Sequence, residues 1–143
     1  MVKLQALAGD LGIGDCVTWL GFVEDADLAA LYACGDLFVL CTREDPRARG
    51  VEGFGMVFLE AQAAGVPALG TRAGGIPDAI VEGRGGWLVD QDDSAAVSGH
   101  LQRLAADVSS FREQGMRGRL RAITEASWDT YATKLLAVID QET

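Results

Sequence analysis

Apolar residues along the chain fall into helical spacing in some stretches and short continuous runs in others. Leu4, Leu7 and Leu11 recur at helical intervals up to Gly12, a residue suited to end a helix. DLFVLCT (36–42) is apolar almost throughout, as expected for a strand covered on both faces. The same reasoning predicts, in order, an opening helix, a strand at 17–23, a helix at 27–33 capped by Asp25, a strand at 36–42, a helix at 55–64, a strand at 66–71, a short helix at 77–82 and a strand at 85–90. A helix capped by Asp93 or Ser94 follows up to about 106, and two further helices span roughly 109–125 and 129–141.

Strands are confined to the first two-thirds of this order, where they alternate with helices. Such alternation predicts an α/β fold, with a Rossmann-like parallel sheet, flanking helices and a helical C-terminal third, in one domain spanning 1–143. Ligands of such sheets bind beyond the carboxyl ends of the strands, where the strand-to-helix loops gather. The loops that matter are therefore 21–25, 42–55, 71–76 and 90–94.

Composition and charge narrow the function classes. The 143 residues are 49% hydrophobic, enough for a core, and carry 12 Lys and Arg against 21 Asp and Glu, for a net charge of -9. This charge makes a protein that binds duplex DNA by neutralising phosphates improbable, so no nucleic-acid partner is predicted. No apolar run is long enough for a membrane span and the N-terminus lacks signal-peptide features, so we expect a cytoplasmic chain.

Cysteine and histidine give little sign of chemistry. Cys16, Cys34 and Cys41 stand among apolar neighbours without a CxxC pair or a nearby histidine, so we expect buried thiols and no metal site. The single histidine, His100, falls in the C-terminal third, where a surface or half-buried position is expected.

The segment VEGFGMVFLEAQAAGVP (51–67) places two glutamates around a Gly-Phe-Gly turn before an apolar helix. The first amides of that helix have no intrahelical partner, and with the helix dipole they attract anionic oxygen such as phosphate. Gly53 and Gly55 allow the backbone to approach a ligand closely. Glu60 lies on the second turn in an apolar neighbourhood, so we expect it to accept hydrogen bonds.

Carboxylates are good acceptors for vicinal hydroxyls, whether of a ribose or of a hexose. A nucleotide-sugar combines these groups: the amides would hold its diphosphate, one glutamate its ribose and the other its sugar. The alternative stays open that Glu60 faces solvent and that Glu52 only complements the helix dipole.

Glu52 and Glu60, with Gly-Phe-Gly between them, resemble the E-x7-E motif of retaining glycosyltransferases with the GT-B fold, in the large family four. That family includes bacterial mannosyltransferases and sucrose synthases. The likeness runs along almost the whole chain. Further matching segments are 17–23 (V-x-F-x-G-x-V in the family), 36–42 (A-D-x-x-V-x-P-S), 60–67 (E-A-M-A-x-G-x-P), 74–81 (G-G-x-x-E-x-V) and 85–90 (G-x-L-V).

The resemblance implies roles for individual residues. Glu60 would bind the ribose hydroxyls, and Glu52, the candidate catalytic residue, would contact the donor sugar. The resemblance also implies a reaction that requires no metal and no cofactor. The remaining donor-binding candidates are Gly53, Phe54, Gly55 and Met56 through their backbone, Gly21, Phe22 and Val23 beside the nucleobase, Thr42 and Arg43 after the second strand, and Gly74 and Gly75 in a loop facing the cleft. A tight turn would explain the last two glycines equally well.

The sequence also departs from the family pattern. Asp78 replaces a glutamate after the glycine pair, and Cys41 replaces a proline. The family domain opens with a strand, an Arg-x-x-x-x-Lys-Gly loop, a helix and a second strand, none of which precedes Met1. The positive charge for the leaving phosphate is therefore absent, unless Arg43, Arg47 and Arg49 supply it rather than being solvated.

Two missing strands would leave a gap between segments 17–23 and 36–42, and bare strand edges invite pairing. We expect these segments to pair directly, to exchange strands with another copy, or to receive strands from a second chain.

These observations predict the donor-binding part of a retaining glycosyltransferase. Its full-length parent would move a hexose from GDP-mannose or a UDP-sugar to an unidentified acceptor hydroxyl. Peripheral association of that parent with a membrane is a further option. The alternative from another class is a nucleotide-binding or interaction module without turnover of its own.

Overall fold

A computed structural model describes residues 2–44 and 53–141. Its described part contains a three-stranded parallel sheet in the order β1-β2-β3, formed by β1 (Phe38–Leu40), β2 (Ala68–Thr71) and β3 (Gly86–Val89). Ala68 of β2 stands opposite Phe38 on one side and Gly86 on the other. The predicted α/β class with a parallel sheet is therefore confirmed.

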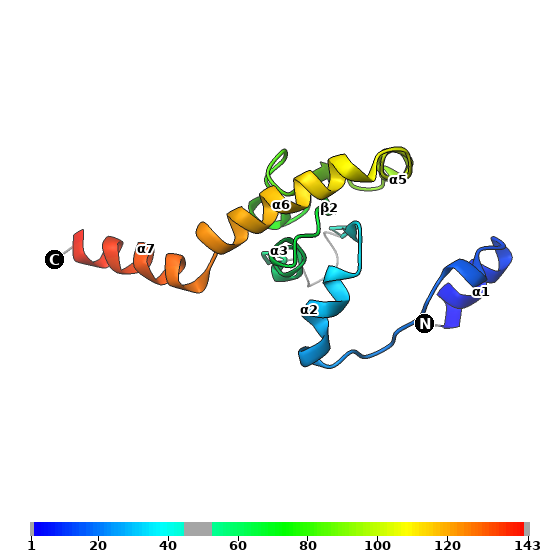
Figure 1. Cartoon of the computed structure of the whole chain (residues 1–143), viewed down its shortest axis with the longest axis horizontal. Helices are drawn as coiled ribbons and strands as arrows, with labels where there is room; N and C mark the ends of the chain where they lie inside the picture. Colours follow the sequence, from blue (N-terminus) through cyan, green and yellow to red (C-terminus); the bar gives the residue numbers. More distant parts are fainter. Residues whose placement is uncertain (1, 45–52, 142–143) are drawn as a thin grey trace.

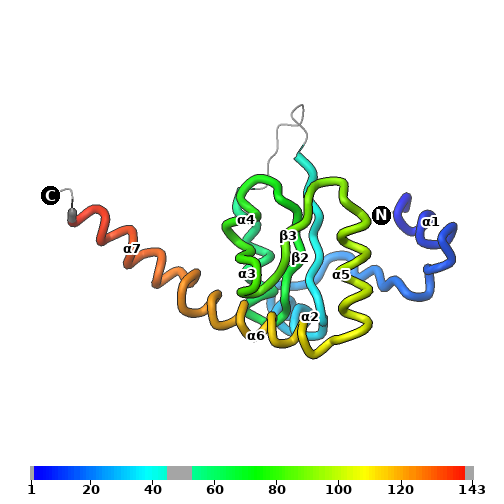
Figure 2. The backbone as a smooth tube through the Cα atoms, turned by 90° about the horizontal axis from the view of Figure 1, so that it is seen from above, coloured from blue at the N-terminus to red at the C-terminus, as the bar shows by residue number. Residues whose placement is uncertain are grey.

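Helices surround this sheet and extend beyond it on two sides. Figures 1 and 2 show α7 projecting from one side of the body, and α1 standing apart on the other. The helices are α1 (Val2–Asp10), the 3-10 turn η1 (Gly14–Cys16), α2 (Asp25–Ala33), α3 (Met56–Ala63), α4 (Ile76–Ala79), α5 (Ser94–Ala106), α6 (Val108–Thr124) and α7 (Trp128–Gln141).

The apolar core lies where α3 and α4 pack on the sheet. Phe58, Ile76 and Ile80 are almost completely buried there, together with the β2 residues Ala68 and Leu69. Burial on this scale is the main favourable contribution to folding, at about 25 cal/mol for each Å² of apolar surface removed from water. The first turn of α3 is thereby fixed at the carboxyl edge of the sheet.

Helix α6 packs closely on this body because small residues line its inner face. A Cβ on Gly115 would lie 2.0 Å from the carbonyl oxygen of Gly65, so only glycine allows this approach. One turn and a half further along, Arg121 is 8% exposed and donates to the carbonyl oxygens of Ala79 (2.9 Å) and Asp78 (2.8 Å). It also donates to Gln62 Oε1 at 3.3 Å, so its guanidinium ties α6 to the end of α4 and to α3.

His100 of α5 is half-buried against the outer strand β3, in agreement with the expectation for this residue. Its ring lies 5.3 Å from that of Trp87, which also contacts Phe111 and carries the Arg103 guanidinium 5.6 Å above it. Burial, and then the charge of Arg103, lower the pKa of His100, while Glu82 opposes that shift.

Most predicted elements are present with bounds shifted by a few residues. Asp93 caps α5 as expected, since its carboxylate accepts from the amide of Ala96 at 2.9 Å. The opening helix ends before Gly12, which has a φ of 68°. The predicted cap of α2 is wrong: Asp25 is the first helical residue, and the N-cap is Glu24, without a side-chain hydrogen bond.

The predicted strand at 17–23 is wrong. The segment contains no strand residue and no described residue pairs with it in a β ladder, so direct pairing with 36–42 does not occur. An apolar segment becomes part of a sheet only when a neighbouring strand forms ladder hydrogen bonds with it. The local sequence pattern does not show whether such a neighbouring strand is present. Exchange with another copy and strands from a second chain stay predictions.

The same open edge explains two further corrections. β1 pairs with β2 alone within the described chain, and Val39 at its centre is 39% exposed rather than covered on both faces. Cys16, Cys34 and Cys41 are exposed free thiols instead of buried ones. All four positions lie in or near segments that the prediction expected to be covered by neighbouring strands.

Within the described ranges, no helix is both long and apolar enough to cross a membrane. The expectation of a cytoplasmic location stays a prediction.

Replacing Arg121 with Met should destabilise the fold. Loss of the guanidinium leaves the Asp78 carbonyl oxygen and Gln62 Oε1 without their donor, while the Ala79 carbonyl oxygen keeps only Gln62 Nε2. We therefore expect the free energy of unfolding to fall by about 3 kcal/mol. Urea denaturation measures this change. Arg117→Met, which removes an exposed i,i+4 ion pair with Glu113, is the matched control and should change stability little; equal effects of the two substitutions would contradict the anchoring role of Arg121.

Stability should decrease as the pH falls from 7.5 to 5.5. Because the folded state holds the pKa of His100 below its unfolded value, the unfolded chain binds the proton first in this window, and protonation favours unfolding. The urea midpoint of the wild type should therefore be lower at pH 5.5. His100→Gln should remove most of this dependence, since the chain has no other histidine; an unchanged pH dependence in that variant would contradict the assignment.

Candidate functional site

The loops that follow the three strands are joined to one another at the carboxyl edge of the sheet. Thr71 Oγ1 donates to the carbonyl oxygen of Thr42 at 2.5 Å, which links the ends of β2 and β1. The amide of Glu44 donates to Gln91 Oε1 at 2.8 Å, and the Glu44 carboxylate accepts from the amide of Gly74. The three loops thus form one connected rim, as the gathering of strand ends predicted.

Two of the predicted glycine segments meet on this rim. A Cβ on Gly75 would lie 2.0 Å from the carbonyl oxygen of Gly53 and 3.1 Å from Cα of Phe54. Only a glycine permits this approach of two backbones, and its neighbour Gly74 has a φ of 50°. The tight-turn explanation and a role beside a ligand therefore both remain available for these glycines.

Gly55 is the N-cap of α3 and has a left-handed φ of 76°. Its carbonyl oxygen accepts from the amide of Phe58 at 2.9 Å, which closes the first turn of the helix. A Cβ at this position would lie 2.6 Å from the Phe58 ring. Both constraints require glycine, and together they direct the first amides of α3 toward the rim.

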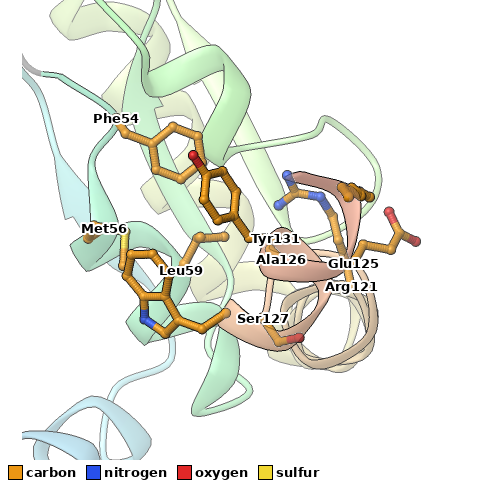
Figure 3. A pocket seen from close by; sticks show the side chains of 10 residues that line it. Phe54, Met56, Leu59, Arg121, Glu125, Ala126, Ser127 and Tyr131 are labelled. Atoms are coloured by element: carbon orange, nitrogen blue, oxygen red, sulfur yellow. The ribbon is translucent and has the colours of Figure 1, made fainter. Parts of the chain in front are cut away.

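The side chains of Phe54 and Met56 turn toward α7. They line a cavity of about 470 Å³ with Leu59, Trp128 and Tyr131, and Figure 3 shows the α3 and α7 side chains facing each other across it. The sequence prediction for these two residues concerned their backbone, and it stays a prediction.

Glu60 is exposed, in agreement with the alternative that it faces solvent, and its side chain leaves the core side of α3 and lies over α2. Its Oε2 accepts from the hydroxyl of Tyr32 at 3.0 Å, as the expectation of a hydrogen bond required. Both residues line a groove of about 720 Å³ between α2 and α3, with Asp25 at one end and Arg119 among its walls.

Thr42 and Arg43 line a different cavity, of about 410 Å³, on the α5 side of the rim. Arg43 Nε lies 3.5 Å from Asp92 Oδ2, and both side chains are largely exposed. Asp90 and Asp93 line the same cavity, so the surroundings of this guanidinium are acidic. Such an exposed pair contributes little to stability, but it directs Arg43 toward the β3 loop.

The structure does not bring every candidate together. Gly21, Phe22 and Val23 lie on the connection into α2, where Gly21 has a φ of 66° and Phe22 is 83% exposed, and none of them lines the three cavities. Glu52, with Arg47 and Arg49, lies outside the described residues. The described ranges hold no cluster of three His, Cys, Asp or Glu side chains that could bind a metal ion.

Sequence reasoning missed Tyr32 and Glu44. Glu44 bonds to loops 30 and 47 residues further along the chain, which no local pattern reveals. Tyr32 offered a weak signal, because a tyrosine on a helix that precedes an apolar strand usually needs a partner for its hydroxyl.

Residues 2–121 match the family Glycosyl transferases group 1, and the chain therefore belongs to this family. The predicted family is confirmed.

Curated relatives agree with this membership. The chain is 33% identical over 136 residues, which are 95% of its length, to the GDP-mannose-dependent alpha-(1-6)-phosphatidylinositol monomannoside mannosyltransferase of Mycolicibacterium smegmatis. It is 36% identical over 130 residues, 91% of its length, to the D-inositol 3-phosphate glycosyltransferase of Streptomyces avermitilis. The matched regions span only 36% and 26% of these relatives.

Solved structures share the fold, which is that of GT-B enzymes. Sucrose-phosphate synthase from Thermosynechococcus elongatus superposes with a TM-score of 0.82 at 27% identity, over 97% of this chain and 33% of that one. Anabaena HepE in complex with UDP gives a TM-score of 0.80 at 22% identity, over 97% of this chain and 36% of that one.

Gly75→Ala should destabilise the rim. The added methyl would overlap the Gly53 carbonyl and force the two backbones apart, which we expect to lower the free energy of unfolding by about 2 kcal/mol. Gly53→Ala is the matched control for stability, since a Cβ at this position would meet no described atom within 4 Å. Chemical denaturation compares the two; a Gly75→Ala variant as stable as the control would contradict the close approach.

Proposed function

We propose that this chain is the donor-binding part of a retaining glycosyltransferase. Its parent transfers a hexose from a nucleoside diphosphate sugar to an acceptor hydroxyl, with retention at the anomeric carbon and without a metal ion or a protein base. Family membership supports the reaction class, and the geometry of the rim supports the donor-binding role.

One observation carries the proposal: α3 begins at the carboxyl edge of the parallel sheet on a left-handed glycine, next to a second glycine loop. The first amides of a helix have no intrahelical partner, and the helix dipole adds partial positive charge there. A diphosphate is the chemical group that this arrangement suits. In this proposal the exposed Gly53, whose Cβ position is open, lets a ligand approach the backbone, and Phe54 and Met56 contribute their amides.

Glu60 supplies the second part of the site. Its carboxylate is exposed and already accepts one hydrogen bond, and vicinal ribose hydroxyls can donate to its remaining lone pairs. In the same proposal Glu52, separated from Glu60 by seven residues, contacts the donor sugar. Gly21, Phe22 and Val23 flank the base, and Thr42 and Gly74 border the cleft.

The relatives guide the choice of donor. The name of the mycobacterial relative specifies GDP-mannose, which favours GDP-mannose as the donor here. A structural neighbour crystallised with UDP-glucose keeps UDP-sugars as the second choice. The phosphatidylinositol acceptor in that relative's name favours a parent enzyme that works at a membrane surface.

A nucleotide-binding module without turnover is the second candidate, and the position of Arg43 favours it. Departure of a nucleoside diphosphate requires positive charge at the leaving phosphate. Arg43 instead pairs with Asp92 in an acidic cavity on the α5 side of the rim. Under this alternative the chain binds nucleotides but completes catalysis only with groups from another chain segment.

Calorimetric titration with GDP, UDP, GDP-mannose and UDP-glucose tests the donor-binding role. We expect the wild-type chain to bind at least one nucleoside diphosphate, and Glu60→Ala to weaken that binding by roughly 10- to 100-fold, because charge-assisted hydrogen bonds contribute about 1.5–3 kcal/mol. Assay of the same samples for sugar release separates turnover from binding alone.

Glu113→Ala is the matched control, because Glu113 is an exposed glutamate on α6 whose partner is Arg117. It should leave nucleotide affinity unchanged. No binding of any nucleoside diphosphate would contradict the donor-binding role, and equal affinities of wild type and Glu60→Ala would remove Glu60 from the site. Turnover by the isolated chain would exclude the second candidate function, a nucleotide-binding module that catalyses no reaction of its own.

A further inference from the structure

The carboxylate of Glu60 is held by a residue from a different helix. Tyr32 of α2 donates its hydroxyl to Oε2 of Glu60 at 3.0 Å, across 28 positions of sequence. No ion pair involves Glu60 among the described residues, so this hydrogen bond is the contact that orients its carboxylate.

The ring of Tyr32 is itself fixed by aromatic packing. It meets the ring of Phe38 in β1 edge to face, with centroids 5.6 Å apart and planes at 72°. Phe38 in turn meets Phe58 at 5.5 Å and 79°. Phe58 is completely buried and precedes Glu60 by two residues in α3. The three rings thus connect the core beneath α3 to the hydroxyl that contacts Glu60, and such pairs favour this edge-to-face geometry.

The hydroxyl remains a donor at neutral pH. Burial, and then the hydrogen bond with the Glu60 carboxylate, raise the pKa of Tyr32 above its ordinary value of 10.0. A carboxylate has about four lone-pair sites, so the bond from Tyr32 leaves Oε1 and one site on Oε2 for other donors. Two hydroxyls on adjacent carbons match that remaining capacity.

The groove around this pair has room for a ligand. Its volume is about 720 Å³, and Leu28, Ala29 and Ala33 of α2 give it an apolar wall opposite Glu60. An exposed glutamate without a fixed neighbour would lose side-chain conformational entropy on binding. A carboxylate already oriented by Tyr32 avoids part of that loss.

We propose that Tyr32 is a positioning residue that fixes the Glu60 carboxylate for the two vicinal hydroxyls of the donor ribose. This inference rests on the proposed donor-binding function, and it assigns to α2 a part in recognising ribose. Tyr32 acts through Glu60 and does not itself touch the ligand.

The ligand experiment compares nucleotides with and without the two vicinal ribose hydroxyls. Calorimetry with GDP and UDP, and with their 2′,3′-dideoxy forms, which have no hydroxyl to donate to Glu60, gives the affinity ratio between ribonucleotide and dideoxynucleotide for each variant. Tyr32→Phe, which keeps the ring but removes the donor, should reduce that ratio by about fivefold, the worth of one hydrogen bond of about 1 kcal/mol. Affinity for the dideoxy form should stay unchanged.

Tyr131→Phe is the matched control, because Tyr131 is the only other tyrosine and lies on α7, 60% exposed. Its ratio should equal that of the wild type. A parallel loss of affinity for both nucleotide forms in Tyr32→Phe would show a merely structural role and overturn the proposal.

A second measurement needs no ligand. In the Tyr131→Phe background, Tyr32 is the single tyrosine, so its ¹³Cζ resonance can be observed alone. Adding Glu60→Ala should shift that resonance, because the hydroxyl loses its acceptor. An unchanged resonance would overturn the hydrogen bond itself, whatever binds. A shifted resonance in a chain that binds no nucleotide would instead contradict the proposed function, and with it the ribose role of Tyr32.

Discussion

The approach of two loop backbones at the carboxyl edge of the sheet is the constraint on which the site depends. The Gly53 carbonyl occupies the space that any side chain on Gly75 would need. This contact sets where the chain enters α3, and the left-handed conformation of Gly55 then directs the first amides of that helix to the edge. A side chain at either position would displace the helix start and cover the amides.

Helix α3 transmits this constraint to the rest of the molecule. Phe58 fills the core beneath it, Gln62 accepts the buried Arg121 of α6, and Glu60 faces α2 through Tyr32. Consecutive turns of one short helix therefore contact the sheet, the C-terminal helices and the second helix. Because these contacts share a single rigid element, a change that shifts α3 would alter both stability and the groove beside Glu60.

Periodicity and turn chemistry predicted much of the fold. Asp93 caps α5 because its carboxylate reaches an amide three residues away, and Gly12 ends α1 for a similarly local reason. The segment at 17–23 failed as a strand, and the cysteines failed as buried residues, because both outcomes depend on neighbours that lie elsewhere in space. An apolar segment favours burial, but whether another element packs against it is decided by the tertiary structure.

The sequence by itself determined the α/β class, the positions of the glycines and acids around α3, and the resemblance to group 1 glycosyl transferases, since these follow from spacing along the chain. Only the tertiary structure decided that Glu60 is exposed, that Tyr32 holds it, and that Arg43 pairs with Asp92 instead of facing the α3 amides. The two contacts join residues at least 28 positions apart, and exposure likewise depends on how elements pack rather than on local propensity.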